Sequence, residues 1–201
     1  MIKFVYFDVG GVVIKDFSKT NKWEDFMVSI GVDKKDFDRF DEYWEDLEVS
    51  VIDDMKSIVP NINNEFGLKL SPEYDLLSEF TSRFEKNESI WPIISKIKKM
   101  HKIGLLTDQY PGMLEDIYKR GLMPDTEFDI VIDSSVEKIQ KPQREIYELA
   151  EKRSGYSGSE ILFIDNSQSK LIVPQTMGWN VLLYDPANIE KSNNGLLKLL
   201  V

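Results

Sequence analysis

The sequence predicts an α/β fold: a Rossmann-like, doubly wound parallel sheet with a helical cap inserted after the first strand. The first observation behind this prediction is a set of five short apolar runs spread along the 201 residues. Each run is continuously apolar rather than alternating, which is typical of strands buried on both faces of a sheet that helices cover. The runs lie at residues 4–7, 103–106, 130–132, 161–164 and 181–184.

The second observation is that helical patterns lie between the later apolar runs. In residues 90–100, for example, Ile93, Ile97 and Met100 recur at the spacing of one helix face. Alternation of strand and helix is the pattern of a doubly wound α/β domain. The other predicted helices cover residues 113–120, 144–152 and 195–200.

Residues 15–89 interrupt this alternation, and we predict that they form the helical cap on a core domain made of residues 1–14 and 90–201. The segment is dense in charge and contains no convincing strand, whereas its aromatic residues recur at helical spacing. Its strongly acidic stretch is most simply a solvated helix face. The aromatic residues are Phe37, Phe40 and Trp44, and turns are predicted at Pro60-Asn61 and Ser71-Pro72.

The composition excludes several kinds of chemistry. The chain has no cysteine and a single histidine, His101, which rules out disulfides and thiolate zinc sites and argues against histidine-based triads. Its formal net charge of −10 disfavours binding to nucleic acid or to an anionic membrane surface. The sequence shows no signal-peptide pattern and no apolar stretch long enough to span a bilayer, so we expect a cytoplasmic protein. Catalysis would therefore rest on carboxylates, lysine, hydroxyl groups or an oxygen-bound metal.

Polar residues follow the apolar runs at the place where open α/β sheets bind ligands, beyond the carboxyl ends of the strands. Asp8 follows the first run and precedes Gly10 and Gly11, a pattern typical of a carboxylate beside closely approaching backbone. Each such residue is also compatible with a local role as a helix cap, a turn residue or a surface charge. Their shared placement at successive strand ends is what favours a site. The other members are Thr107, Asp108, Asp165, Asn166, Ser167 and, just before the helix that begins near residue 144, Lys141-Pro142.

Taken in order, these groups resemble the four motifs of the haloacid dehalogenase (HAD) superfamily, and the resemblance covers nearly the whole chain. The spacing from Lys141-Pro142 to the strand that ends at Asp165 is its more specific part. Residues 15–89 resemble the cap domain of these enzymes. Within the superfamily, the chain most resembles the subgroup that contains small-sugar phosphatases and the phosphatase domain of soluble epoxide hydrolases. The four motifs are residues 7–12, 105–108, 141–142 and 163–167.

The resemblance implies a HAD-family hydrolase, a phosphatase whose partner is a small phosphorylated metabolite such as a sugar phosphate. By this resemblance Asp8 would attack phosphorus to give an aspartyl-phosphate. Thr107 would hydrogen-bond a phosphoryl oxygen, and Lys141 would neutralise the developing charge and pair with Asp8. This would be covalent catalysis combined with electrostatic stabilisation.

The resemblance also implies a magnesium ion at the same site. Mg²⁺ would lie between Asp8, the main-chain carbonyl of Gly10 and a residue of the fourth motif, either Asp165 or Asn166. There it would bridge the nucleophile and the phosphate, so that two anions can approach each other. The residues expected to contact the substrate are Gly10, Gly11 and Asp108.

Two residues depart from the pattern of the family. Gly10 stands where these phosphatases usually carry a second aspartate, the general acid and base, and Asn166 replaces an acid that binds metal. The missing acid predicts a preference for esters with low-pKa leaving groups, unless Asp108 or a cap acid supplies the proton. The departures keep two alternatives open: a catalytically impaired protein that binds a ligand or a partner, and a metal-independent 2-haloacid dehalogenase in which Arg39 receives the halide. The substrate and the oligomeric state have no readable signal in the sequence.

Overall fold

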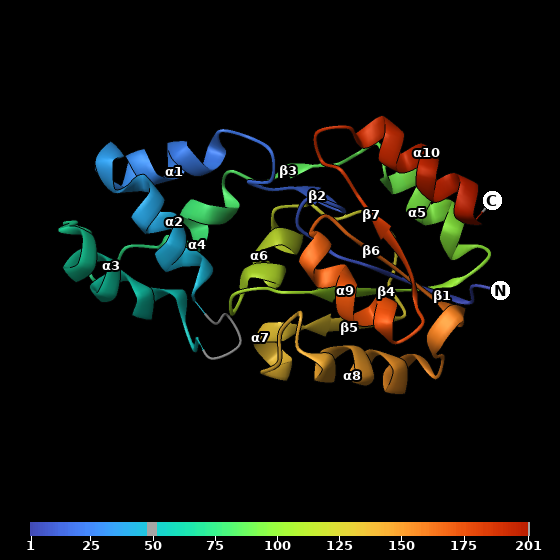
Figure 1. The fold of residues 1–201 in the computed structure, drawn as a ribbon. Helices are drawn as coiled ribbons and strands as arrows, with labels where there is room; N and C mark the ends of the chain where they lie inside the picture. Colours follow the sequence, from blue (N-terminus) through green and yellow to red (C-terminus); the bar gives the residue numbers. More distant parts are fainter. Residues whose placement is uncertain (48–51, 201) are drawn as a thin grey trace.

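The computed structural model describes residues 1–47 and 52–200, and its centre is a parallel sheet of five strands (Figure 1). The strands are β1 (Phe4–Phe7), β4 (Lys102–Thr107), β5 (Ile130–Asp133), β6 (Ile161–Asp165) and β7 (Asn180–Leu183). Their order in the sheet is β5-β4-β1-β6-β7, so the first strand of the chain lies in the middle. The predicted Rossmann-like α/β class is therefore confirmed, and each of the five apolar runs forms a strand.

Five helices cover the two faces of this sheet (Figure 1). They are α5 (Trp91–Lys98), α6 (Met113–Lys119), α8 (Arg144–Ser154), α9 (Gln168–Thr176) and α10 (Ile189–Leu200). In β1, Val5 and Phe7 pack into one core with side chains of α5, α6 and α10, whereas Phe4 and Tyr6 pack into a second core with α8 and α9. Because both faces of β1 are buried, the strand reads as a continuous apolar run.

Two of these helices differ from the sequence prediction, and a short one adds to it. Helix α9 is absent from the prediction, because Pro174 lies inside it and its apolar residues form no stripe at helical spacing. Helix α10 begins at Ile189 rather than at Gly195. After β5 the single turn α7 (Ser134–Glu137) is capped by Asp133, whose Oδ1 accepts a hydrogen bond of 2.8 Å from the backbone N–H of Ser135.

Between β1 and α5 the described residues form four α-helices, which lie to one side of the sheet (Figure 1). They are α1 (Lys22–Ile30), α2 (Phe37–Glu45), α3 (Ile58–Phe66) and α4 (Leu76–Thr81), with 3₁₀ turns at Lys34–Asp36 and Met55–Ser57. The short antiparallel strands β2 (Ile14–Lys15) and β3 (Glu85–Lys86) pair where the chain leaves the core and returns to it. The prediction that this segment has no strand is wrong here, because strands of two residues are too short to show a periodicity.

One of the two predicted turns is wrong and the other is confirmed. Pro60 and Asn61 lie inside α3, where Pro60 is in the first turn and its missing N–H has no intrahelical acceptor to lose. At Ser71-Pro72 the chain does turn, because the backbone N–H of Tyr74 donates to the carbonyl of Ser71 over 2.9 Å.

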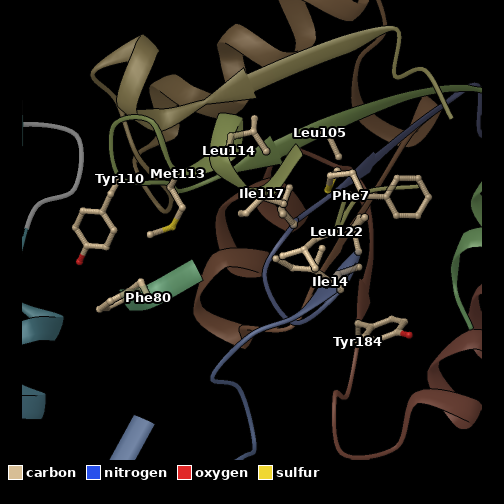
Figure 2. Close-up of a cluster of buried hydrophobic side chains, with 14 of the residues drawn as sticks. Phe7, Ile14, Phe80, Leu105, Tyr110, Met113, Leu114, Ile117, Leu122 and Tyr184 are labelled. Carbon is tan, nitrogen blue, oxygen red and sulfur yellow. The ribbon is translucent and has the colours of Figure 1, made fainter. Parts of the chain in front are cut away.

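Aromatic rings pack the helices of the inserted segment together and join them to the core. In α2, the rings of Phe40 and Trp44 stack with their centroids 5.5 Å apart, and the Trp44 ring lies 5.2 Å from that of Phe80 in α4. Figure 2 shows Phe80 facing Tyr110, in the loop after β4, and Met113, the first residue of α6 on the core side. Helix α4 therefore packs directly on α6 and fixes the segment over the carboxyl end of β4.

No helix in the described part of the chain is both long enough and apolar enough to cross a bilayer.

Candidate active site

The carboxylates that follow β1 and β6 meet around a single buried lysine. The Nζ atom of Lys141 lies 3.0 Å from Asp8 Oδ1 and 2.7 Å from Asp165 Oδ2. Adjacent parallel strands place Asp8 and Asp165 at the same edge of the sheet, and Lys141 enters from the loop before α8. The Lys141 side chain is only 2% exposed, so its charge acts in a region of low dielectric. The structure thus brings together three residues that the sequence placed at separate strand and loop ends.

Asp8 is buried and shares its one cation with a second carboxylate, and its pKa lies above the ordinary value. Burial is the main cause, raising the pKa of Asp8 to about 7; Lys141 opposes the rise, whereas Asp165 and Asp108 add to it. Burial also lowers the pKa of Lys141, but the carboxylates of Asp165 and Asp8 raise it above its ordinary value overall. Lys141 therefore stays protonated, and the site has too little positive charge for its carboxylates.

The loop after Asp8 holds the carboxylate and brings backbone close to it. The backbone N–H of Val9 donates to Asp8 Oδ1 over 2.8 Å, and the carbonyl of Val9 accepts from the N–H groups of Val12, Val13 and Ile14. Gly11 has a φ of +70°, and a Cβ there would lie 2.2 Å from the amide nitrogen of Asn166. Only glycine fits position 11, which is a structural reason for the glycine in the motif.

Thr107 and Asp108, which follow β4, occupy different places. Thr107 is fully buried and is not among the residues that line the cavity, and its hydroxyl accepts a hydrogen bond of 2.8 Å from Gln109 Nε2. Asp108 lines the cavity; its Oδ1 accepts from the backbone N–H of Lys141 over 2.9 Å, and its Oδ2 lies 3.2 Å from Lys170 Nζ. Asp108 therefore positions the lysine loop, and the predicted hydrogen bond from Thr107 to a phosphoryl oxygen stays a prediction.

Asp165 and Asn166, the two residues of the fourth motif that were predicted to bind a metal, differ in which of their oxygen atoms are free to do so. Both oxygens of Asp165 are engaged, Oδ2 by Lys141 and Oδ1 by the backbone N–H of Ser167 at 2.8 Å. Asn166 lines the cavity and donates from Nδ2 to Ser18 Oγ over 2.8 Å, which leaves its amide oxygen as the potential ligand. Of the two, Asn166 is better placed to reach a cation.

The donor set at this edge fits a hard cation such as Mg²⁺. Asp8, the backbone at Gly10 and Asn166 all border the same cavity, and each can supply oxygen, the ligand that Mg²⁺ prefers. Among the described residues there is no group of three acidic or histidine side chains that could hold a metal alone. Main-chain oxygen, water and a substrate phosphate would therefore have to complete the coordination.

A cavity of about 370 Å³ opens above these groups, a size that suits a small molecule. Its floor is formed by charged and polar side chains, four carboxylates but only two lysines, from the ends of the strands and the following loops. Its walls are apolar and come from both the core and the inserted segment. The charged residues are Asp8, Asp16, Asp108, Asp165, Lys141 and Lys170, and the apolar walls include Phe17, Phe80, Phe84, Tyr110 and Met113.

Four polar residues of the cavity are absent from the sequence prediction: Asp16, Ser18, Gln109 and Lys170. Lys170 lies on α9, whose irregular pattern concealed the helix, and its Nζ also donates to the carbonyl of Lys141. Asp16 and Ser18 follow β2, a strand too short to detect from sequence. Burial raises the pKa of Asp16, and the backbone N–H of Ser18, which donates to it, opposes the rise. The sequence signal that could have located them is their position directly after the apolar residues 12–14.

The arginine expected in a dehalogenase is engaged elsewhere. Arg39 lies on α2, where Nη2 donates to the carbonyl of Glu65 over 2.6 Å and the guanidinium lies 4.6 Å from the centre of the Phe66 ring. Arg39 does not border the cavity. In this structure Arg39 packs α2 on α3 and is not placed to receive a halide displaced from a substrate carbon by Asp8.

Comparison with protein families gives one match, and it spans most of the chain. A sequence model for haloacid dehalogenase-like hydrolases matches residues 2–169. A search of curated proteins finds no match to the chain.

Solved structures share the fold at low sequence identity. A predicted HAD-like family hydrolase from Porphyromonas gingivalis is 23% identical over 100% of this chain and 98% of that one, with a TM-score of 0.78. A HAD family enzyme from Bacteroides thetaiotaomicron, in complex with magnesium and inorganic phosphate, is 19% identical over 90% of this chain and 93% of its own, with a TM-score of 0.70. The L-2-haloacid dehalogenase of Xanthobacter autotrophicus is also 19% identical, over 90% and 76% of the two chains, with a TM-score of 0.64.

Proposed function

The chain belongs to the haloacid dehalogenase-like hydrolase family, and from that membership we propose that it is a magnesium-assisted phosphatase of a small phosphorylated metabolite. The observation that supports the proposal most strongly is the shared lysine: Lys141 lies between Asp8 and Asp165, and the cavity opens over all three. A carboxylate beside a protonated lysine, with an excess of acid around it, suits the transfer of an anionic group with the help of a cation.

In the proposed reaction Asp8 attacks phosphorus and becomes the aspartyl-phosphate. The Asp8 carboxylate is held through Oδ1 by Lys141 and by the Val9 N–H, so Oδ2 is the oxygen that faces the reaction. The charge of Lys141 offsets the negative charge on the phosphoryl group as it transfers. Asp165, fixed by the Ser167 N–H, holds the lysine in place and is a positioning residue.

A magnesium ion would be held by Asp8, the carbonyl of Gly10 and the amide oxygen of Asn166. When bound, it supplies the positive charge that lets a phosphate approach a carboxylate. The need for it is consistent with four carboxylates and two lysines around the cavity. The Bacteroides relative was solved in complex with magnesium and inorganic phosphate, which supports the choice of magnesium as the ion.

Selection of the substrate would fall to the walls of the cavity. Phe17, Phe80 and Phe84 come from the inserted segment and its connections, whereas Tyr110 and Met113 come from the loop after β4 and the start of α6. Such a wall favours a compact substrate with an apolar or ring-shaped face, sugar phosphates included. Arg39 takes no part, which disfavours the dehalogenase alternative.

Hydrolysis of p-nitrophenyl phosphate and of a sugar-phosphate panel, with magnesium and with EDTA, tests the proposal. We expect magnesium-dependent turnover that falls by about 10³-fold or more in Asp8→Asn, because the nucleophile is lost while the shape of the side chain is kept. Asp129→Asn is the matched control: Asp129 pairs with Lys98 and Lys102 at the opposite end of the sheet, and its loss should leave kcat/KM within about twofold of wild type.

Two outcomes would contradict the proposal. Turnover at the wild-type level in purified Asp8→Asn would show that Asp8 is not the nucleophile of the reaction. Absence of turnover in the wild type on every ester would favour a binding protein, and halide release from a 2-haloacid without metal would then favour dehalogenation.

A further inference from the structure

The proposed phosphatase reaction requires a proton for the leaving group, and Gly10, two residues after the nucleophile, cannot supply one. We propose that Asp16 is the general acid and base of this enzyme, reaching the cavity from the connection to the cap and replacing the side chain that position 10 lacks. This inference rests on the proposed function and adds a catalytic residue to it.

The carboxylate of Asp16 occupies the space of the missing side chain. A Cβ built on Gly10 would lie 2.6 Å from Asp16 Oδ2, 3.4 Å from its Cγ and 3.9 Å from its Cβ. The backbone of Gly10 is not among those with positive φ, so the crowding comes from Asp16 rather than from backbone strain. Asp16 also lines the cavity together with Asp8. A side chain at residue 10 would therefore have to displace the Asp16 carboxylate, and in this chain the acid beside the loop comes from residue 16.

The surroundings of Asp16 hold it in that place. Its Oδ1 accepts a hydrogen bond of 2.8 Å from the backbone N–H of Ser18, and the Ser18 hydroxyl accepts one of 2.8 Å from Asn166. Just before it, Lys15 pairs with Glu85 in the β2–β3 sheet, which fixes the backbone. The backbone N–H of Ser18 donates its hydrogen bond to Oδ1, and Oδ2 is the oxygen that lies next to Gly10. Oδ2 is therefore the oxygen that would carry the proton.

Apart from the nucleophile Asp8, the other two carboxylates of the cavity, Asp108 and Asp165, are engaged on both oxygens. Asp108 accepts from the Lys141 N–H with Oδ1 and pairs with Lys170 through Oδ2. Asp165 accepts from the Ser167 N–H and from Lys141 Nζ. A proton on either residue would break one of these bonds, whereas Asp16 has no ion pair among the described residues. Asp108, suspected from the sequence as the substitute acid, is therefore a poorer candidate than Asp16.

The proposed reaction has two steps, formation of the aspartyl-phosphate and its hydrolysis, and Asp16 transfers a proton in each. In the first, the bond between Asp8 and phosphorus forms, the ester P–O bond breaks, and the protonated Asp16 carboxyl gives its proton to the departing oxygen, which leaves as the alcohol. In the second, water attacks the phosphorus of the aspartyl-phosphate and gives a proton to the Asp16 carboxylate, and the bond between the Asp8 oxygen and phosphorus breaks. Inorganic phosphate leaves, and Asp8 and Asp16 return to their starting forms.

The test compares Asp16→Asn with wild type on two esters, p-nitrophenyl phosphate and an alkyl phosphate. Asparagine keeps the Oδ1 acceptor for Ser18 but cannot donate the proton. We expect kcat/KM on the alkyl ester to fall by about 10²–10⁴-fold, whereas kcat/KM on the aryl ester, whose leaving group needs no proton, should fall by less than about 10-fold. With the aryl ester the variant should also show a burst of p-nitrophenol, because hydrolysis of the aspartyl-phosphate has lost its base.

Two further variants complete the design. Asp33→Asn is the matched control, since the Asp33 Oδ1 likewise accepts from the N–H two residues on, and both ester activities should stay at wild-type level. The double variant Gly10→Asp with Asp16→Gly moves the acid to position 10 and should restore alkyl phosphate turnover at least 10-fold over Asp16→Asn, as roughly expected for one proton donor.

Equal losses on both esters with no burst would show that Asp16 only shapes the loop, and would overturn the inference while leaving the phosphatase proposal intact. A wild type that hydrolyses neither ester would overturn the proposed function and, with it, the role of Asp16.

Discussion

The two ends of the central sheet each hold a cluster of carboxylates and lysines, but in opposite proportion. At the carboxyl ends of the strands, one buried lysine, Lys141, is shared by Asp8 and Asp165. At the opposite ends, one carboxylate, Asp129, is shared by Lys98 at 2.7 Å and Lys102 at 3.2 Å, and its side chain is 20% exposed. The same two residue types therefore build a cation-poor centre at one end and a cation-rich, partly solvated one at the other.

The pKa values move in opposite directions at the two clusters. Burial raises the pKa of Asp8 to about 7, because Lys141 does not outweigh the loss of water and the neighbouring acids. Burial also raises the pKa of Asp129, but hydrogen bonds from Lys98, the Ile103 N–H and Lys102 outweigh it, and the pKa falls to about 2. The first cluster has fewer positive than negative charges, and a bound cation can supply the difference. In the second cluster the carboxylate is already paired with two lysines, and these ion pairs contribute to stability.

Removing a lysine from each cluster should give the largest contrast. In Lys141→Met, two buried carboxylates lose their cation, so we expect about 3–5 kcal/mol of lost stability and a fall of at least about 10²-fold in phosphatase kcat/KM. In Lys98→Met, Asp129 keeps Lys102 and some water, and the loss should be under about 1 kcal/mol with no change in activity. Urea unfolding and steady-state kinetics of both variants measure this.

Similar losses of stability in the two variants would contradict the comparison. They would mean either that Lys141 is well solvated or that Lys98 contributes far more to the free energy of unfolding than its partly exposed side chain indicates.

The sheet and part of this contrast could be predicted from the sequence, because both depend on local patterns. Continuous apolar runs predicted all five core strands, and the rule that ligands bind beyond the carboxyl ends of strands predicted Asp8, Asp108 and Asp165. Lys141 was added as the residue just before the helix that begins near residue 144. The positions of the acids relative to Lys141 could not be predicted, since they depend on how loops from distant parts of the chain fold onto one another.

The errors have physical reasons of the same kind. Helix α9 was missed because Pro174 and an irregular apolar pattern conceal it, and with it Lys170. Asp16 was missed because its place beside Gly10 results from the pairing of β2 and β3, each only two residues long and contributed by segments 70 residues apart, roughly a third of the chain. The predicted turn at Pro60 is wrong because proline is also compatible with the first turn of a helix, where Pro60 lies.

Asp8→Asn should change the pH dependence of stability in a magnesium-free buffer. A carboxyl with a raised pKa in the folded protein contributes stability that is complete below the unfolded pKa, near 4, and is lost as the pH rises through about 7. The variant lacks this loss, so its stability relative to wild type should increase by about 2–4 kcal/mol between about pH 4 and about pH 7 and then level off. Urea unfolding across this range measures the gap. A constant gap would show that Asp8 titrates normally in the folded protein.

Asp129→Asn should show the opposite sign and a smaller effect. A carboxyl with a lowered pKa contributes stability that is present above the unfolded pKa, near 4, and is lost as the pH falls through about 2. Wild type should therefore exceed the variant by about 1–2 kcal/mol at pH 7, the lower figure reflecting the exposure of Lys102, and the gap should close below about pH 3. Thermal unfolding of the two proteins over this range measures it. If the gap instead widened toward low pH, the two lysines would not be holding Asp129 in its charged form, and the two ends of the sheet would differ in burial alone.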